Sequence, residues 1–142
     1  MTRTRTASAS PTAYKALVQF DAAVTAALGS ELVDLVKLRA SQINGCGYCV
    51  DIHAEDLAKA GIPQRTVNGV AAWRHTTFFT EEQTIGLEFT DALTAGIDPI
   101  DDDLWDRAGE VLGEQRRAAL VLAVGLINTW NMIGLATELV AR

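Results

Sequence analysis

The sequence has few prolines, few cysteines and no long run of purely apolar residues. Only three of its 142 residues are proline and 49% are hydrophobic, which indicates one globular domain rather than a disordered or fibrous chain. A chain of this length buries enough surface to fold without a disulfide scaffold or a structural metal, so the two cysteines need another explanation. The most apolar stretch, Ala118 to Ile127, is about half as long as the roughly 20 residues of a membrane span, and we interpret it as a buried helix.

Positive charge is scarce as well. The 12 Lys and Arg residues are outnumbered by 18 Asp and Glu residues, which gives a net charge of −6. This sign disfavours binding to a nucleic-acid backbone or to an anionic membrane surface. The first ten residues carry two arginines and no acid, but no apolar signal-peptide core follows them. We therefore expect a flexible N-terminal tail over residues 1–10 and a cytoplasmic protein.

Helix start and stop signals recur along the chain and predict an all-α fold. No stretch alternates apolar and polar residues between turn signals, so we expect no strand. No repeat or long linker divides the chain, so residues 11–142 should form a single helical domain. The expected helix starts are Ser10-Pro11, Ser30 as a cap, about Cys46, Pro63, Thr80, Asp98-Pro99 and about Glu114. The expected stops are Gly29, Asn44-Gly45, Gly61, Gly96 and Gly113.

Two of the expected helix starts carry specific capping devices. Thr80 and Gln83 have the spacing of a capping box, in which each side chain bonds to the backbone of the other residue. Asp98-Pro99 combines a cap with a proline, and three acids over 101–103 follow in the turn where the helix dipole favours them. Apolar residues recur at helical spacing along the earlier segments: Leu17, Phe20, Val24, Leu28, Leu32, Leu35, Val36, Ile43, Val67, Val70 and Trp73.

The residues with chemical potential concentrate at the start of the third expected helix, in the sequence NGCGYCVDIH over 44–53. On a helix, Cys46, Cys49 and His53 lie within about 60° of one another and share one face. Two thiols three residues apart can close a small disulfide loop, and a helix N-terminus favours the thiolate. His53 lies one turn beyond Cys49 and can accept its proton directly or through one water. Cys46 lies roughly 10 Å from His53 along the helix axis, too far for this transfer.

Two other interpretations of the cysteines stay open. They could be small buried hydrophobic residues, although the glycines and the asparagine around them suit a helix entrance better. Cys46, Cys49 and His53 could also bind zinc, but a closed structural site takes four ligands, and no second CxxC or HxxxH motif supplies the fourth. We therefore expect no bound metal. The other histidine, His75, is expected on the surface near a helix end.

The sequence around the cysteines resembles a known family. The run from Leu35 to His53, LVKLRASQINGCGYCVDIH, is similar to the core of AhpD-like alkylhydroperoxidases, within the carboxymuconolactone decarboxylase superfamily. The stretches AWRHTTFFTE over 72–81 and INTWN over 127–131 agree with this resemblance, which extends from about residue 32 to about residue 134. The resemblance implies an AhpD-like helical bundle, assembly into trimers or hexamers, and thiol-dependent reduction of hydroperoxides.

The resemblance also implies catalytic roles for four residues. In the family, an upstream carboxylate, the second cysteine and a histidine form a proton relay, which corresponds here to Asp34, Cys49 and His53. Cys49 would attack the peroxide, and Cys46 would convert the resulting sulfenic acid into a disulfide. The family position of Asp34 usually holds Glu, which is one methylene longer, and Glu31 one turn earlier is a possible substitute.

The position of Asp34 in the sequence allows two interpretations. It lies on the helix before the cysteines, so it could fold back beside them and orient His53. Alternatively, Asp34 is a solvated charge that pairs with Lys37, three residues further along the same helix face.

The sequence therefore predicts a cofactor-free thiol peroxidase that acts on small organic hydroperoxides or hydrogen peroxide and is recycled by a dithiol reductant. A carboxymuconolactone-type decarboxylase is an alternative that the shared fold permits, although lactone decarboxylation requires no cysteine pair. A redox-sensing or disulfide-exchange protein with little turnover is a further alternative.

Two expectations concern the rest of the surface and core. We expect a homo-oligomer, because the apolar faces and Phe78, Phe79, Trp105 and Trp130 provide more hydrophobic surface than one short bundle covers. Asn128 and Asn131 lie within the apolar last helix. We expect them to make structural hydrogen bonds rather than to face the substrate.

Overall fold

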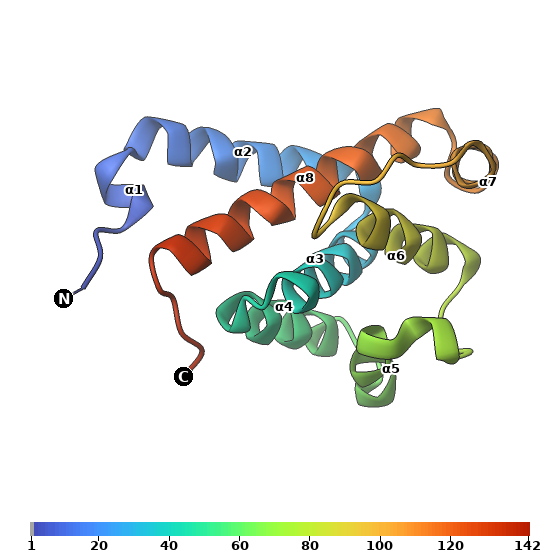
Figure 1. Cartoon of the computed structure of the whole chain (residues 1–142), viewed down its shortest axis with the longest axis horizontal. Helices are drawn as coiled ribbons and strands as arrows, with labels where there is room; N and C mark the ends of the chain where they lie inside the picture. The colour runs from blue at the N-terminus through green and yellow to red at the C-terminus, as the bar shows by residue number, and fades with distance from the viewer. Residues whose placement is uncertain (1) are drawn as a thin grey trace.

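The computed structural model describes residues 2–142, and helices account for all of the regular structure in that range (Figure 1). The absence of strands from these residues confirms the predicted all-α fold. The α-helices are α1 (Thr6–Ala9), α2 (Pro11–Leu28), α3 (Ser30–Asn44), α4 (Gly47–Lys59), α5 (Gln64–Gly69), α6 (Glu81–Leu93), α7 (Asp102–Leu112) and α8 (Glu114–Ala136), and a 3₁₀ helix, η1 (Val70–His75), follows α5.

Helix α3 lies at the centre of the bundle, where it packs against α4, α6 and α8, and α2 lies alongside α8 (Figure 1). The reason is its sequence, since apolar residues cover two sides of α3. Val33 and Val36 face a core shared with α2, α6, α7 and α8, whereas Leu35 and Leu38 face a second core shared with α4, η1 and α6. A helix that is buried on two sides must also bury charged residues that lie between them, and Lys37 is one of these.

The apolar pattern and several helix ends were predicted correctly. Among the apolar positions at helical spacing, Leu17, Phe20 and Ile43 are half-buried and the others are buried. The capping box of α6 is present in full: the Thr80 hydroxyl accepts from the Gln83 backbone N–H at 3.3 Å, and the Gln83 side chain accepts from the Thr80 N–H at 2.9 Å. These bonds satisfy backbone donors that the first helical turn leaves free.

Two predicted helix starts are wrong. Helix α7 begins after Asp101, whose side chain accepts from the Leu104 N–H at 2.8 Å, whereas the Asp98 N–H still bonds back to the Ala92 carbonyl at the end of α6. Ser30 does not cap α3 either. The N-cap is Gly29 at φ 101°, a backbone conformation that glycine adopts without a Cβ penalty.

The helix predicted from Pro63 changes character halfway. It begins as α5 and continues as the 3₁₀ helix η1, with a kink where Ala72 leaves helical geometry at φ −130° and ψ 38°. Within the expected N-terminal tail, residues 6–9 form the single turn α1, and Arg3 contacts Glu138 at 2.9 Å and the Ala136 carbonyl at 2.7 Å. Flexibility of residues 1–10 stays a prediction.

Helix α8 is the one helix among residues 2–142 that is long and apolar enough to cross a membrane by length and composition. Its apolar character has another cause, because Leu120, Leu126 and Ile127 lie in the main core. The expected burial of 118–127 is nevertheless incomplete, since Val121 and Leu122 are exposed. A cytoplasmic location stays a prediction.

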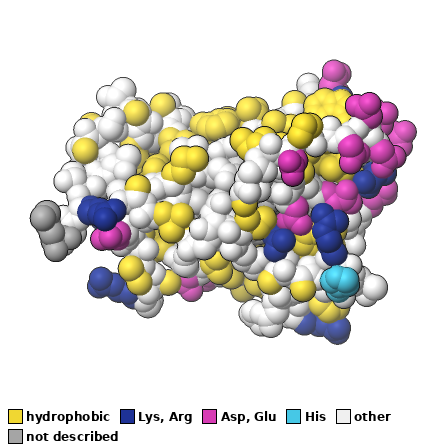
Figure 2. All heavy atoms as spheres, viewed as in Figure 1, with side chains coloured by type: hydrophobic (Ala, Val, Ile, Leu, Met, Phe, Trp, Pro, Cys, Tyr) yellow, Lys and Arg dark blue, Asp and Glu magenta, His cyan; other side chains and the backbone are white. Residues whose placement is uncertain are grey.

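Among the four aromatic residues expected to provide hydrophobic surface, Trp105 is exposed and the other three are not. Phe78, Phe79 and Trp130 are half-buried, and Trp105 is covered on one side by Arg117, whose guanidinium lies 4.0 Å from the ring centroid. Hydrophobic side chains are instead spread over the face along which α2 and α8 run, while acidic side chains gather at the α7 end (Figure 2). The large apolar residues exposed on α8 are Val121, Leu122, Met132 and Leu135.

Candidate active site

The cysteine motif forms the junction between α3 and α4. Gly45 has a left-handed backbone conformation at φ 73°, which ends α3 and turns the chain into α4. Cys46 is the N-cap of α4, and its sulfur accepts from the Cys49 N–H at 3.3 Å. The two cysteines form a disulfide with their Cα atoms 5.3 Å apart, so they are a redox pair in its oxidised state. The interpretation as two separate buried hydrophobic residues is therefore wrong.

A cavity of about 220 Å³ lies beside this disulfide. Cys49 lines it, whereas Cys46 does not, and Cys46 is also the more deeply buried of the two, with 1% of its surface exposed against 5%. The wall is mostly aromatic and aliphatic, and the rings of Tyr14 and Trp130 meet edge to face with centroids 5.5 Å apart. The lining residues are Tyr14, Asp21, Tyr48, Cys49, Ile52, His53, Trp130, Ile133 and Leu139.

His53 shares this cavity with Cys49 and is held from the same helix. Its Nδ1 lies 3.7 Å from Asp56 Oδ2, which is too long for a hydrogen bond, and this buried nitrogen has no hydrogen-bond partner among the described residues. Burial, and next the charge of Lys37, lower the pKa of His53 from 6.5 to about 4, although Asp56 and Asp21 oppose the shift. The imidazole is therefore neutral at neutral pH and free to accept a proton.

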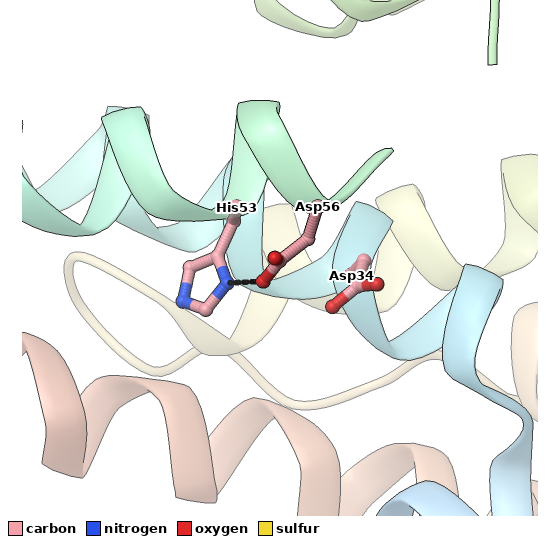
Figure 3. Close-up of side chains that lie close together, drawn as sticks. All are labelled: Asp34, His53 and Asp56. Atoms are coloured by element: carbon pink, nitrogen blue, oxygen red, sulfur yellow. Dashed lines mark ion pairs between the residues drawn. The ribbon is translucent and has the colours of Figure 1, made fainter. Parts of the chain in front are cut away.

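Asp34, on α3, also lies near His53. Its carboxylate, His53 and Asp56 have ligand atoms within 4.8 Å of one another, and Figure 3 shows Asp56 beside the imidazole with Asp34 beyond it. Burial and the nearby charge of Asp56 raise the pKa of Asp34 to about 6, against a weaker opposing effect of Lys37. The fold thus brings Asp34 near His53, and His53 shares the cavity with Cys49, although Asp34 does not line that cavity. Their catalytic roles stay predictions.

The two alternatives considered for this carboxylate do not fit the structure. Asp34 does not pair with Lys37, because the Lys37 ammonium binds both oxygens of Asp21, at 2.9 and 2.8 Å. Glu31 is exposed and accepts from the Gln83 side chain at 2.8 Å, outside the group around His53.

Asp21 is a site residue that the sequence analysis missed. It lies on α2, lines the cavity and accepts from the Trp130 Nε1–H at 2.8 Å as well as from Lys37. Burial raises the pKa of Asp21, but its hydrogen bonds and the Lys37 charge outweigh burial and lower it. Through this one carboxylate, α2 is tied to α3 and α8, three helices that surround the site. No local pattern indicates this contact, since Asp21 and Trp130 are 109 residues apart.

Asparagines connect the end of α3 to α8. The Asn44 side chain donates to Asn128 at 2.8 Å and to Asn131 at 3.0 Å, and Asn131 in turn donates to Ser41 at 3.0 Å. Asn128 also donates to the Val124 carbonyl at 2.8 Å. These are structural hydrogen bonds, as expected from the sequence, and neither Asn128 nor Asn131 lines the cavity.

Helix α8 lies close to the disulfide at Gly134. A Cβ atom at this position would lie 2.9 Å from the sulfur of Cys46 and 3.4 Å from that of Cys49. The first distance is too short for packed atoms, so only glycine allows α8 to lie this close to the cysteine pair.

The donor types around His53 are ones that metals can bind. Asp34, His53 and Asp56 make three donors, one fewer than a closed structural zinc site uses. The zinc set considered from the sequence also requires two thiolates, which the disulfide removes. His75, the other histidine, is exposed in the last turn of η1, as expected.

Known proteins share this fold and sequence. Residues 11–92 match the model of the carboxymuconolactone decarboxylase family. The chain is 34% identical over 104 residues to uncharacterized protein YdfG of Bacillus subtilis, covering 72% of this chain and 71% of that protein. A stretch of 37 residues, 26% of this chain and 21% of its relative, is 46% identical to alkyl hydroperoxide reductase AhpD of Coxiella burnetii.

A solved structure agrees over the whole chain. The crystal structure of a protein of unknown function from Agrobacterium tumefaciens, named as a candidate AhpD antioxidant defence protein, superimposes with a TM-score of 0.91 at 31% sequence identity. The match covers 100% of this chain and 99% of that one.

Proposed function

The chain belongs to the carboxymuconolactone decarboxylase family, and from this premise we propose that it is a thiol-dependent peroxidase that reduces small hydroperoxides. The observation that carries the proposal is the disulfide between Cys46 and Cys49 at the edge of a cavity that Cys49 shares with His53. The similarity of part of the chain to an alkyl hydroperoxide reductase supports the same activity.

The first step uses Cys49 and His53. In the reduced protein, the neutral imidazole accepts the Cys49 proton, and the thiolate attacks the terminal oxygen of the hydroperoxide. An S–O bond forms as the O–O bond breaks, so the sulfur is oxidised to a sulfenic acid and the peroxide is reduced. The proton held by His53 goes to the departing alkoxide, and the product is an alcohol, or water when the substrate is hydrogen peroxide.

The second step uses Cys46. Its sulfur attacks the Cys49 sulfenic acid, an S–S bond forms, and the hydroxyl leaves as water. The product is the disulfide form described above. A dithiol reductant then restores both thiols by exchange and is itself oxidised to a disulfide. Because Cys49 lines the cavity and Cys46 is more deeply buried, we expect the reductant to attack the Cys49 sulfur.

A disulfide-exchange or redox-sensing protein is the second candidate, since it would form the same disulfide. It differs in turnover, because a sensor is oxidised once and a peroxidase repeats the cycle when a dithiol is supplied. The decarboxylase alternative is less well supported, because lactone decarboxylation has no use for a cysteine pair.

Single-turnover oxidation tests the proposal and the order of attack. The reduced protein is mixed with one hydroperoxide, and mass spectrometry follows Cys46 and Cys49. We expect Cys46→Ser to consume one equivalent and stop at a sulfenic acid on Cys49 that dimedone traps, and we expect Cys49→Ser to consume none. A trapped sulfenic acid on Cys46 in the Cys49→Ser protein would reverse the assignment.

A homo-oligomer, trimer or hexamer, remains part of the proposal. The supporting feature is the exposed apolar face of α8, where Met132 is 66% and Leu122 is 51% exposed. Light scattering should give a mass that is a multiple of the 15.2 kDa chain at micromolar concentration. A 15.2 kDa species alone would contradict self-association.

A further inference from the structure

Two carboxylates face one buried imidazole, and the imidazole hydrogen-bonds to neither. His53 Nδ1 lies 3.7 Å from Asp56 Oδ2, and this nitrogen is fully covered with no partner among residues 2–142. Leaving a buried polar atom unpaired costs about 1–3 kcal/mol. A side-chain movement of less than one ångström at Asp56 would remove this cost, and catalytic hydrogen bonds are often this long before substrate binds.

The orientation of the ring leaves one nitrogen for chemistry. Figure 3 shows Nδ1 directed at Asp56 and the other ring nitrogen, Nε2, on the side away from both carboxylates. His53 also lines the cavity that holds Cys49. If a carboxylate fixes the proton of the neutral ring on Nδ1, the lone pair lies on Nε2, which is then the atom that accepts a thiol proton.

Asp56 suits this role better than Asp34 does. It follows His53 by three residues on the same helix, a spacing at which side chains are neighbours, and its Oδ2 lies 3.7 Å from the ring Nδ1. Asp34 is more buried, and burial together with the Asp56 charge raises its pKa to about 6. As the pH falls toward 6, Asp34 therefore takes up a proton.

The remaining charged groups near the imidazole do not compete for it. Lys37 of α3 faces His53, and so does Asp21 of α2, but these two are bound to each other at 2.8 Å. The partner that α8 supplies to this pair is the neutral Trp130, which donates to Asp21. Asp56 and Asp34 are thus the two carboxylates left to act on His53.

We propose that Asp56 is the positioning residue of His53, and that it holds the proton of the neutral ring on Nδ1 so that Nε2 serves as the base for Cys49. The catalytic consequence rests on the proposed peroxidase function, whereas the tautomer does not. This role of Asp56 differs from the proton relay implied by the family resemblance, in which Asp34 is the carboxylate that acts with His53 and Cys49. Here Asp34 is a neighbouring acid that does not fix the position of the ring proton.

Nitrogen-15 NMR of the reduced, histidine-labelled protein reads the tautomer directly. The chain has two histidines, so a His75→Gln variant assigns the signals. At pH 7 we expect His53 to carry its proton on Nδ1. Asp56→Ala should move the proton largely to Nε2, and Asp56→Ser, whose hydroxyl is too short to reach the ring, should do the same, so the test does not depend on one variant folding.

Three further variants separate a positioning role from a structural one. Asp56→Glu keeps a carboxylate at this position and should therefore keep the Nδ1–H tautomer. Asp34→Asn should retain it. Glu55→Gln is the matched control, because it removes the same charge from the same helix at an exposed position paired with Lys59 at 3.0 Å, and it should change nothing.

A chemical readout that needs no peroxide keeps this inference separate from the proposed activity. Alkylation of Cys49 by iodoacetamide at pH 7 should slow about tenfold in Asp56→Ala, below the 10²–10⁴-fold that the base itself contributes. The proposal is overturned if His53 is an Nε2–H tautomer in the parent, if Asp56→Ala leaves tautomer and alkylation rate unchanged, or if Asp34→Asn alone moves the proton. Normal tautomer behaviour without peroxide consumption would instead refute the peroxidase function and leave the role of Asp56 intact.

Discussion

Helix α3 contributes one residue to each of two groups of polar side chains, and the two groups differ in whether their polar atoms have hydrogen-bond partners. Lys37 binds both oxygens of Asp21, and Asp21 also accepts from Trp130, so the first group is a closed network. Asp34 belongs to the second group, in which the nearest contact of His53 is 3.7 Å from Asp56 and Nδ1 is unpaired. Buried polar groups are normally satisfied, and a titratable one without a partner is a candidate for a functional role. The first group therefore holds the helices around the site, and the second is where the proposed proton transfer would take place.

The largest expected effect comes from removing the base in the unsatisfied group. His53→Gln should slow hydroperoxide consumption by about 10²–10⁴-fold, the usual contribution of a positioned base. The same substitution should change the free energy of unfolding little, because glutamine is also a neutral polar side chain. Stopped-flow kinetics and urea unfolding measure the two effects. A rate within threefold of the parent would show that proton transfer does not involve His53.

Removing one charge from the Lys37–Asp21 pair should instead lower the free energy of unfolding. Lys37→Met leaves Asp21 charged and largely buried, and we expect a loss of roughly 3 kcal/mol in the free energy of unfolding, the low end for half of a buried ion pair. The double variant Asp21→Asn/Lys37→Met removes both charges and should recover most of this loss. Urea unfolding of the parent, the single variants Lys37→Met and Asp21→Asn, and the double variant completes the cycle, and losses of the two single variants that simply add in the double variant would mean that the pair is not coupled.

A substitution at Gly134 of α8, next to the disulfide, tests how a change in packing alone affects stability. In Gly134→Ala, the added Cβ would meet the Cys46 sulfur at 2.9 Å. We expect a loss of about 1–3 kcal/mol, as for other overpacked positions. Gly125→Ala is the matched control on the same helix, since its Cβ would meet nothing within 4 Å. Thermal unfolding of the oxidised proteins should separate the two variants, and equal melting temperatures would contradict the close approach of α8.

The smallest effect is a pair of opposite pH dependences. The pKa of His53 is lowered to about 4 in the folded state, so the unfolded chain binds that proton first and stability falls as the pH drops from 6.5 toward 4. The pKa of Asp34 is raised from 3.8 to about 6, so the folded state binds that proton first and stability falls as the pH rises through the same window. In the parent, the two trends oppose each other.

Single variants should expose each trend. Between pH 4 and 6.5, Asp34→Asn should gain stability as the pH rises, because the His53 dependence remains. His53→Gln should lose stability over the same range, because the Asp34 dependence remains. Urea unfolding at four pH values gives the slopes. Slopes of the same sign in both variants would contradict the assignment of one of these groups.

The parts of the site that could be predicted from sequence are the local ones. Cys46 and Cys49 pair at the start of α4, and His53 follows Cys49 by one turn of the same helix, so local backbone geometry is enough to place them. Asp56 has the same kind of local spacing to His53, so the i to i+3 rule could have found it, but the resemblance directed attention to Asp34.

The parts that could not be predicted depend on long-range contacts. Asp21 reaches Lys37 across 16 residues and Trp130 across 109, and nothing in its neighbourhood distinguishes it from other charges on α2. In the fold, the capping box at Thr80 was correct because its bonds are local. The start at Asp98-Pro99 was wrong because the Asp98 N–H is used by the end of α6 and the neighbouring Asp101 supplies the cap.

Turnover of a hydroperoxide in the presence of excess dithiol tests the central claim most directly. The account predicts that the parent consumes many equivalents of an organic hydroperoxide per chain and stops when the dithiol is exhausted, with one alcohol formed for each disulfide made in the reductant. Consumption of a single equivalent per chain, with the dithiol still present, would contradict the account and leave a protein whose cysteine pair senses oxidation without catalysing it.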